Sequence, residues 1–177
     1  MPEITEFVGF PKIPRLSREC VITEKIDGTN AVVFIGENGE FLTGSRTQWI
    51  TPSNDNHGFS AWAHENKEDL LKLGPGRHFG EWWGNGIQRG YGLEKGVKRF
   101  SLFNTIRWCL AWQTPKRIKK EDTRIEIYQE TLPLCVGLIP VLYQGVFSTP
   151  EVDFALENLA WGGSIASPGF MNPEGIV

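Results

Sequence analysis

The sequence predicts an α+β domain built on antiparallel sheets flanked by helices. Short β-branched and aromatic runs, bounded by glycine, proline and asparagine, recur along the chain, which is typical of strands joined by tight turns. Only two segments, near residues 59–73 and 149–160, carry a strong helical pattern. Helices therefore do not alternate with strands as they do in a doubly wound parallel sheet.

The first strands are expected over residues 20–25 and 31–36, and we expect the Asp27-Gly28 turn to join them as a hairpin. A second turn at residues 37–40 leads to a strand around residues 41–44. Later strands are expected over residues 77–83, 99–104, 125–128, 134–143 and, at the end of the chain, from residue 174 on. Pro140 limits the fourth of these to an edge or a break.

Two helices are expected. In the first, apolar residues recur at helical spacing over residues 59–73, and Gly74 follows as an end signal. The second begins with Thr149 as the N-cap hydroxyl and Pro150 at the first helical position. It runs to about residue 160 and stops at Gly162.

Composition indicates one globular domain over residues 1–177. Apolar residues make up 40% of the chain and charged residues 22%, as in ordinary globular proteins. No apolar run approaches the roughly 20 residues that span a bilayer, and the acidic N-terminus lacks a signal-peptide pattern, so we expect a cytoplasmic protein without a membrane partner. The three cysteines form no close pair and are expected to be free thiols.

The net charge of −3 argues against a protein that coats nucleic acid without specificity, although it allows a local basic groove. The densest basic run, residues 116–120, is either a contact to nucleic acid or a solvated surface. The sequence does not indicate the oligomeric state.

Lys25 is the most informative residue, because it ends a strand-like run just before a glycine turn. One interpretation is a solvated lysine in a surface hairpin. The other is a nucleophile, which needs desolvation or a cationic neighbour to lose its proton. With a phosphorus acceptor, such a site also needs carboxylates for a metal ion and an aromatic surface for a base. Downstream candidates for these parts are Arg46, Glu81, Phe103 and Glu174.

In this order, beginning with Glu24-Lys25-Ile26-Asp27-Gly28-Thr29-Asn30, these motifs resemble those of the covalent nucleotidyltransferases, the nucleic-acid ligases and mRNA-capping enzymes. The chain closely resembles the adenylyltransferase domain of the RNA ligase 2-like family of phages and some cellular organisms. The resemblance runs from motif I at Lys25 to motif IV at Glu174. It implies an ATP-grasp-like ligase nucleotidyltransferase domain that acts in RNA repair.

The resemblance implies a role for each of these residues. Lys25 would attack the α-phosphorus of ATP and hold AMP, and the Glu24 backbone would meet the adenine edge. Ile26 and Phe103 would sandwich the base. The remaining implied contacts are Glu81 to a ribose hydroxyl, Arg46 to the ribose or phosphates, Glu174 to Mg²⁺ and Asn30 to the nucleic-acid strand.

The same resemblance implies RNA ends or a nicked duplex as partners. AMP would pass to a 5′-phosphate, and a 3′-hydroxyl would then displace it to seal the strand. Thr29-Asn30 stands where DNA ligases and capping enzymes usually have an arginine, and too few residues precede Lys25 for the extra domain of an NAD-dependent ligase. ATP is therefore the implied donor.

Some of these residues also have structural interpretations. Phe103 could be a core residue, since Phe100 and Phe103 lie on opposite strand faces. The Glu24 side chain could be solvated, and Asp27 could simply hold the turn. The glycine-rich segment 84–92 is either a plain connection or a flexible loop bordering the ATP or RNA site, with Arg89 supplying a charge.

Two departures from the family pattern bear on function. Asn104 stands where related ligases often have an aspartate. The lysine-containing motif V, which grips the α-phosphate, should follow Glu174 but is absent, so we expect a domain incomplete at its C-terminus. The alternatives are a nucleotide-binding fragment that cannot complete catalysis, or a capping-type or DNA ligase nucleotidyltransferase.

Overall fold

The computed structural model describes residues 18–108 and 132–177 and confirms the α+β class with mainly antiparallel sheets. The expected strand at 125–128, the basic run at 116–120 and Cys109 lie outside the described residues. Six strands form the larger sheet, in the order β4 (Trp49–Ile50), β3 (Phe41–Gly44), β2 (Thr29–Ile35), β5 (Gly76–Gly84), β6 (Lys98–Leu102) and β7 (Val136–Leu138). Only the β6–β7 pair among these is parallel.

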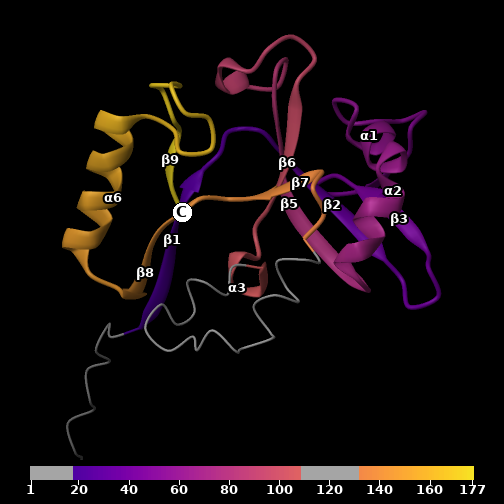
Figure 1. Cartoon of the computed structure of the whole chain (residues 1–177), viewed down its shortest axis with the longest axis horizontal. Helices are drawn as coiled ribbons and strands as arrows, with labels where there is room; N and C mark the ends of the chain where they lie inside the picture. The colour runs from indigo at the N-terminus through magenta and orange to yellow at the C-terminus, as the bar shows by residue number, and fades with distance from the viewer. Residues whose placement is uncertain (1–17, 109–131) are drawn as a thin grey trace, which may run out of the picture.

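A smaller sheet lies beside the larger one (Figure 1). Its three strands are β8 (Val141–Val146), β1 (Glu19–Lys25) and β9 (Gly175–Ile176). The helical segments are α1 (Phe59–Glu65), α2 (Lys67–Leu70), the 3₁₀ turns η1 (Leu71–Leu73) and η2 (Gly90–Gly92), α3 (Thr105–Trp108) and α6 (Thr149–Gly162). Figure 1 shows α6 beside the smaller sheet, and α1 and α2 at the far end of the larger one. No helix of the described residues is long and apolar enough to cross a membrane.

The expected hairpin between the first two strands is wrong, because β1 and β2 belong to different sheets. Strand β2 has both edges occupied, by β3 and by β5, while β1 pairs with β8 and β9. Ile26, which is 5% exposed, is buried where the chain crosses between the sheets. Lys25 therefore stands at a junction of two sheets rather than in a surface turn.

Three other expectations need correction in detail. The first helix is divided at Asn66, whose backbone angles (φ −101°, ψ 17°) leave the helical range and whose side-chain amide donates to the Trp62 carbonyl at 2.8 Å. The long strand at 134–143 is two strands in different sheets, broken at Pro140 as expected. The N-cap of α6 is Ser148 and not Thr149, since the Ser148 hydroxyl accepts from the Glu151 amide.

An aromatic cluster joins α1 to one face of the larger sheet. The ring centroids of Phe59 and Phe100 lie 5.0 Å apart, and those of Trp62 and Trp82 lie 4.9 Å apart. Phe59 and Phe100 are fully buried, and Trp82 is 2% exposed. Offset and tilted ring pairs of this kind add to the stabilisation from burial alone.

We expect Phe59→Ala to lower the free energy of unfolding by about 3–5 kcal/mol, because it removes the centre of this cluster and leaves a cavity. The matched control is Phe154→Ala on α6, where the ring is 60% exposed and the change should stay within about 0.5 kcal/mol. Urea denaturation followed by tryptophan fluorescence measures both. Equal losses in the two variants would contradict this assignment of the core.

Candidate functional site

A cavity of about 690 Å³ lies at the junction of the two sheets, a size typical of ligand pockets. All the site residues predicted from the sequence contribute to its wall, namely Glu24, Lys25, Ile26, Asn30, Arg46, Glu81, Phe103 and Glu174. These residues come from six separate strands or strand ends. The fold therefore brings together side chains that are up to 150 positions apart in the sequence.

Lys25 ends β1 and pairs across the ladder with Gly175 of β9. This register places Glu174 beside it, and the Lys25 ammonium forms an ion pair with the Glu174 carboxylate. Both side chains are partly exposed, 47% for Lys25 and 25% for Glu174. The amine is thus held within the cavity and remains open to a ligand.

The Glu24 side chain is fully buried, so the interpretation that it is solvated is wrong. Its carboxylate accepts hydrogen bonds from the backbone amides of Ile165 and Ala166, each at 2.9 Å, and from the Ser164 hydroxyl at 2.5 Å. Strand alternation sends this side chain away from that of Lys25. Three donors satisfy the buried charge and tie the segment that precedes β9 to β1.

Tyr91 holds the backbone on either side of Ile26. Its hydroxyl accepts from the Asp27 amide at 2.9 Å and donates to the Lys25 carbonyl at 3.3 Å. The ring is fully buried between Trp83 and Phe170, and burial raises the pKa of the Tyr91 hydroxyl, which keeps it a donor. Sequence reasoning missed Tyr91, and its only local signal was a tyrosine between two glycines.

Arg89 acts on the same turn. Its guanidinium donates to the Asp27 carboxylate at 2.9 Å and to the Asn172 carbonyl at 3.2 Å. Arg89 is not part of the cavity wall, and whether it supplies a charge to the ATP or RNA site stays a prediction. The glycine-rich segment supports the turn that follows Lys25, which agrees with a holding role for Asp27.

Glu81 on β5 faces the glycine turn and Asn30 across the β2–β5 pair. One carboxylate oxygen accepts from the Gly28 amide and the other from the Asn30 side-chain amide, both at 3.1 Å. Burial raises the pKa of Glu81 to about 7, and these two hydrogen bonds only partly offset the desolvation. The Glu81 carboxyl therefore changes its protonation near neutral pH.

Phe103 and Arg46 lie at the more open part of the cavity. Phe103 is 42% exposed, whereas Phe100 is fully buried, so the inward-facing member of this pair is Phe100. Arg46 is exposed just after β3. Asn104, the position where related ligases often have an aspartate, accepts from the Arg107 amide at 3.1 Å at the start of α3. Asparagine and aspartate are equally good in that capping role.

No group of three or more His, Cys, Asp or Glu side chains in the described residues could hold a metal ion by itself. The cavity does contain the partly exposed carboxylate of Glu174. One carboxylate beside open space suits Mg²⁺, which keeps several waters and binds substrate phosphates more than it binds dedicated protein cages. The residues present therefore fit an ion brought in with a phosphate ligand.

The fold is that of RNA ligase nucleotidyltransferase domains. A Naegleria gruberi RNA ligase variant solved with ATP and Mn superimposes with a TM-score of 0.56 at 19% identity, over 90% of this chain and 46% of that one. A second variant from the same organism, solved with AMP and Mn, gives 0.57 at 19% identity over 91% and 46%. A third structure, the Naegleria gruberi RNA ligase with PPi, gives a TM-score of 0.55 at 19% identity over 90% of this chain and 45% of that one.

The sequence profile of the RNA ligase family matches residues 18–177, and the chain belongs to this family. No curated protein matches the sequence significantly. The chain spans less than half the length of the solved ligases that it resembles.

We expect the free energy of unfolding of the wild type, measured relative to that of Glu81→Gln, to fall as the pH rises from about 4.5 through about 7. A carboxyl whose pKa is raised by folding binds its proton more tightly in the native state, so folding is favoured below the unfolded pKa and loses that contribution as the pH passes the folded pKa. Urea denaturation of both proteins across this range measures the difference. A constant difference between them would contradict the raised pKa.

We expect Tyr91→Phe to cost about 1–3 kcal/mol of unfolding free energy, because the Asp27 amide loses its acceptor. Tyr143→Phe is the matched control, since it also removes one hydroxyl, which donates to the Val146 carbonyl at 2.8 Å in a more exposed place. Thermal unfolding distinguishes the two variants. Equal shifts would show that the Tyr91 hydroxyl does not hold the turn.

Proposed function

We propose that this chain is the adenylation domain of an ATP-dependent RNA ligase and that Lys25 accepts AMP from ATP. The observation that carries the proposal is the position of the Lys25 amine in a nucleotide-sized cavity. The Phe103 ring and the carboxylates of Glu81 and Glu174 line the same cavity. Membership of the RNA ligase family supports it. The related Naegleria gruberi structures with ATP, AMP and PPi support the same class of ligand.

The adenosine would lie along the wall formed by Ile26, Phe103 and Glu81. Ile26 is fixed in a buried cluster with Trp83 and Tyr91, so it offers a rigid apolar surface to one side of the base. The half-exposed ring of Phe103 is free to cover the other side, and a stacked base is worth about 1–3 kcal/mol. The Glu24 backbone would meet the adenine edge.

The polar contacts follow from the same arrangement. The ionised Glu81 carboxylate would accept a hydrogen bond from a ribose hydroxyl, while its hydrogen bond from the Gly28 amide keeps it oriented. Arg46, at the open edge of the cavity, would contact the ribose or phosphates with its forked guanidinium.

In the chemical step, the Lys25 nitrogen forms a bond to the α-phosphorus, the bond from that phosphorus to the bridging oxygen breaks, and pyrophosphate leaves. The ammonium must first leave its ion pair with Glu174 and release its proton to solvent, because only the neutral amine is a nucleophile. The hydrogen bonds of Tyr91 to either side of Ile26 fix the backbone from which Lys25 projects. Such positioning is a large part of catalysis of this kind.

The ligase family implies Mg²⁺ as the metal ion. Glu174 would hold this ion, partly through water. A bound ion would neutralise the phosphates as charge develops on them. Occupation of the Glu174 carboxylate in this way is compatible with release of the Lys25 amine, since the two groups are paired in the structure.

The ligation steps would use RNA ends or a nicked duplex. AMP would pass from Lys25 to a terminal 5′-phosphate, and a 3′-hydroxyl would then attack that phosphate and displace AMP. Asn30, whose side chain is held by Glu81 at the cavity wall, is the proposed contact to the RNA strand.

A second function, nucleotide binding without completed ligation, is favoured by one observation. Among the described residues, Lys25 and Arg46 are the only lysine and arginine side chains in the cavity wall, which is few cations for a triphosphate. The cavity described above would then bind ATP but need further residues for rapid transfer.

Incubation with α-labelled ATP and Mg²⁺, followed by mass spectrometry, tests the proposal. We expect an acid-labile AMP adduct on Lys25 and its loss in Lys25→Ala, while Lys95→Ala, on an exposed loop, keeps the adduct. ATP binding measured by calorimetry separates the two functions, because binding without an adduct supports the second. A GMP adduct formed from GTP, or no nucleotide binding by the chain, would contradict the proposal.

A further inference from the structure

The larger sheet has an open face next to the nucleotide cavity. The register places Phe34 of β2 opposite Leu42 of β3 and Arg77 of β5, and it pairs Val32 with Phe79. These side chains share one face, because residues directly opposite each other in a ladder point to the same side. The other face carries the buried residues of β2 that belong to the core with α1.

The open face exposes large aromatic side chains. Phe79 is 53% exposed and Trp49 is 47% exposed, and Phe103, just beyond the end of β6, is 42% exposed. The Phe103 amide donates to the Phe79 carbonyl at 3.0 Å, so these two residues are neighbours across the β5–β6 pair. Aromatic surface of this kind therefore continues from the nucleotide cavity onto the sheet.

Arg77 lies over this surface. Its guanidinium carbon is 5.6 Å from the Phe34 ring centroid and 5.8 Å from that of Trp49, which is cation–π geometry. None of the ion pairs found within residues 18–108 and 132–177 involves Arg77. The charge is held in place by aromatic rings and stays available to an anion.

A second hollow, of about 230 Å³, adjoins the nucleotide cavity at this face. Arg77, Phe79 and Arg107 contribute to its wall, and Phe103 and Asn104 are shared with the nucleotide cavity. No aspartate or glutamate occurs in the described part of this wall. Phe103 thus separates two adjoining hollows. The second presents the exposed ring of Phe79 and the guanidinium of Arg77, whereas the Arg107 guanidinium donates to the Leu73 carbonyl at 3.0 Å and lies 4.6 Å from the Trp108 ring centroid.

We propose that single-stranded RNA binds to this arginine–aromatic face, defined by Phe34, Trp49, Arg77 and Phe79, with one nucleotide in the second hollow. The base would stack on Phe79, and the adjoining phosphate would contact Arg77. The proposal deepens the proposed function and rests on it, because it gives the RNA substrate a binding site beside the adenylated lysine.

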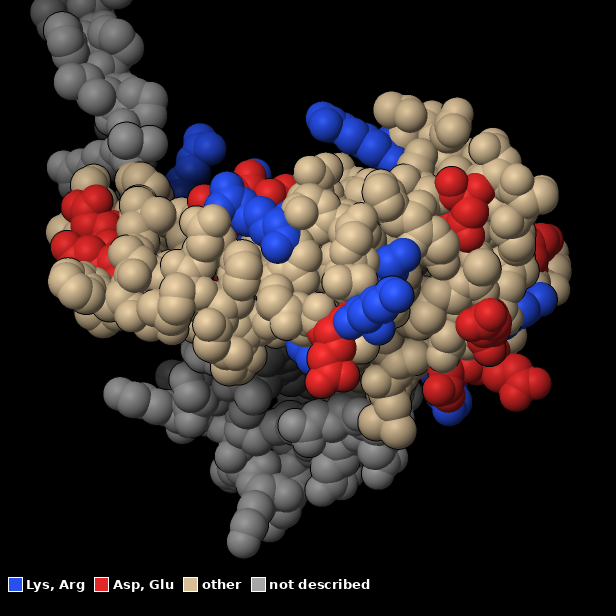
Figure 2. Space-filling model, turned by 90° about the horizontal axis from the view of Figure 1, so that it is seen from above, with Lys and Arg blue, Asp and Glu red and all other residues tan. Residues whose placement is uncertain are grey.

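Charge and ring content favour this occupant over an apolar protein surface. Stacking platforms beside cationic groups are the usual means of binding single strands without sequence preference, since every base has a π-face. Lys and Arg elsewhere on the molecule do not form one large basic area on the face shown in Figure 2, where charges of both signs are mixed. Because the net charge is also −3, general attraction for RNA is weak, and binding would depend on a small site.

Fluorescence anisotropy with a short, labelled single-stranded oligoribonucleotide, without ATP, tests the proposal on the whole chain. We expect Phe79→Ala to weaken RNA binding about tenfold through loss of one stacked base. Arg77→Gln should lower the slope of log affinity against log salt concentration by about 0.7 for the lost phosphate contact, a change that Phe79→Ala should not produce.

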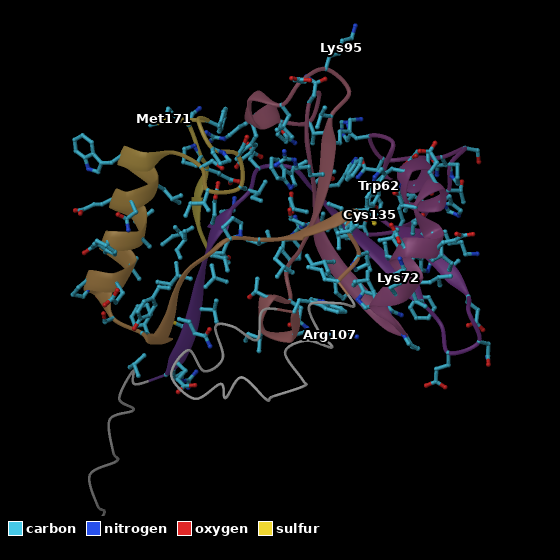
Figure 3. The ribbon with its side chains drawn as sticks, viewed as in Figure 1. Trp62, Lys72, Lys95, Arg107, Cys135 and Met171 are labelled. Atoms are coloured by element: carbon cyan, nitrogen blue, oxygen red, sulfur yellow. The ribbon has the colours of Figure 1, made fainter. Side chains whose placement is uncertain are left out.

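Matched controls lie away from this face. Trp161→Ala removes an aromatic ring that is 85% exposed on α6. Lys95→Gln removes a charged side chain that points away from the ribbon in Figure 3. Both controls should bind RNA as the wild type does. All four variants should bind ATP unchanged, because none alters the proposed nucleotide contacts.

RNA binding unchanged in both Phe79→Ala and Arg77→Gln would overturn the proposal, as would no RNA binding by the wild type. Either result, together with normal ATP binding or an AMP adduct on Lys25, would leave the adenylation function standing. If Phe79→Ala changed only self-association in sedimentation, the face would be a protein contact and the RNA site would be refuted.

Discussion

The pairing of β1 with β9, fixed by the buried carboxylate of Glu24, is the interaction on which the site depends. Strand β9 pairs with β1 through only two residues, Gly175 and Ile176. A ladder of this length is too short to be stable by itself. The Glu24 carboxylate adds three hydrogen bonds to the segment at residues 164–166. Hydrogen bonds to a charged group are stronger than neutral ones, and a buried carboxylate without them would be strongly destabilising.

This constraint explains why the neighbouring residues Glu24 and Lys25 have different roles. Because side chains alternate along β1, Glu24 points into the protein and fastens the C-terminal segment, while Lys25 points into the cavity and meets Glu174. Tyr91 and Arg89 hold the following turn from another direction. The backbone on both sides of the lysine is therefore fixed, and the long side chain itself remains able to move toward a ligand.

The sequence predicted the fold class from its local patterns, and through its resemblance to ligases it named residues that all contribute to the cavity wall. It failed where the outcome depended on distant partners. An Asp-Gly turn is the same local signal whether the flanking strands pair or enter different sheets, so the expected hairpin was wrong. The burial of Glu24 depends on Ser164, which is 140 positions away, and no local pattern indicates that contact.

Smaller differences have local physical causes. Asn66 interrupts the first helix through its own backbone angles, φ −101° and ψ 17°, which apolar periodicity does not register. Ser148 and Thr149 are both good N-cap residues, and only the observed hydrogen bond selects the first. Tyr91 was missed because its role depends on a hydroxyl that reaches a turn more than 60 positions earlier in the chain.

The central claim is that the cavity at the sheet junction holds ATP with its α-phosphorus at Lys25. A crystal structure of the Lys25→Met variant, which cannot be adenylylated, with ATP tests it most directly. We expect the base between Ile26 and Phe103, and the α-phosphorus within about 3–3.5 Å of the place that the Lys25 nitrogen would reach, as in a near-attack arrangement. ATP bound elsewhere, or bound here with its triphosphate directed away from residue 25, would contradict the account.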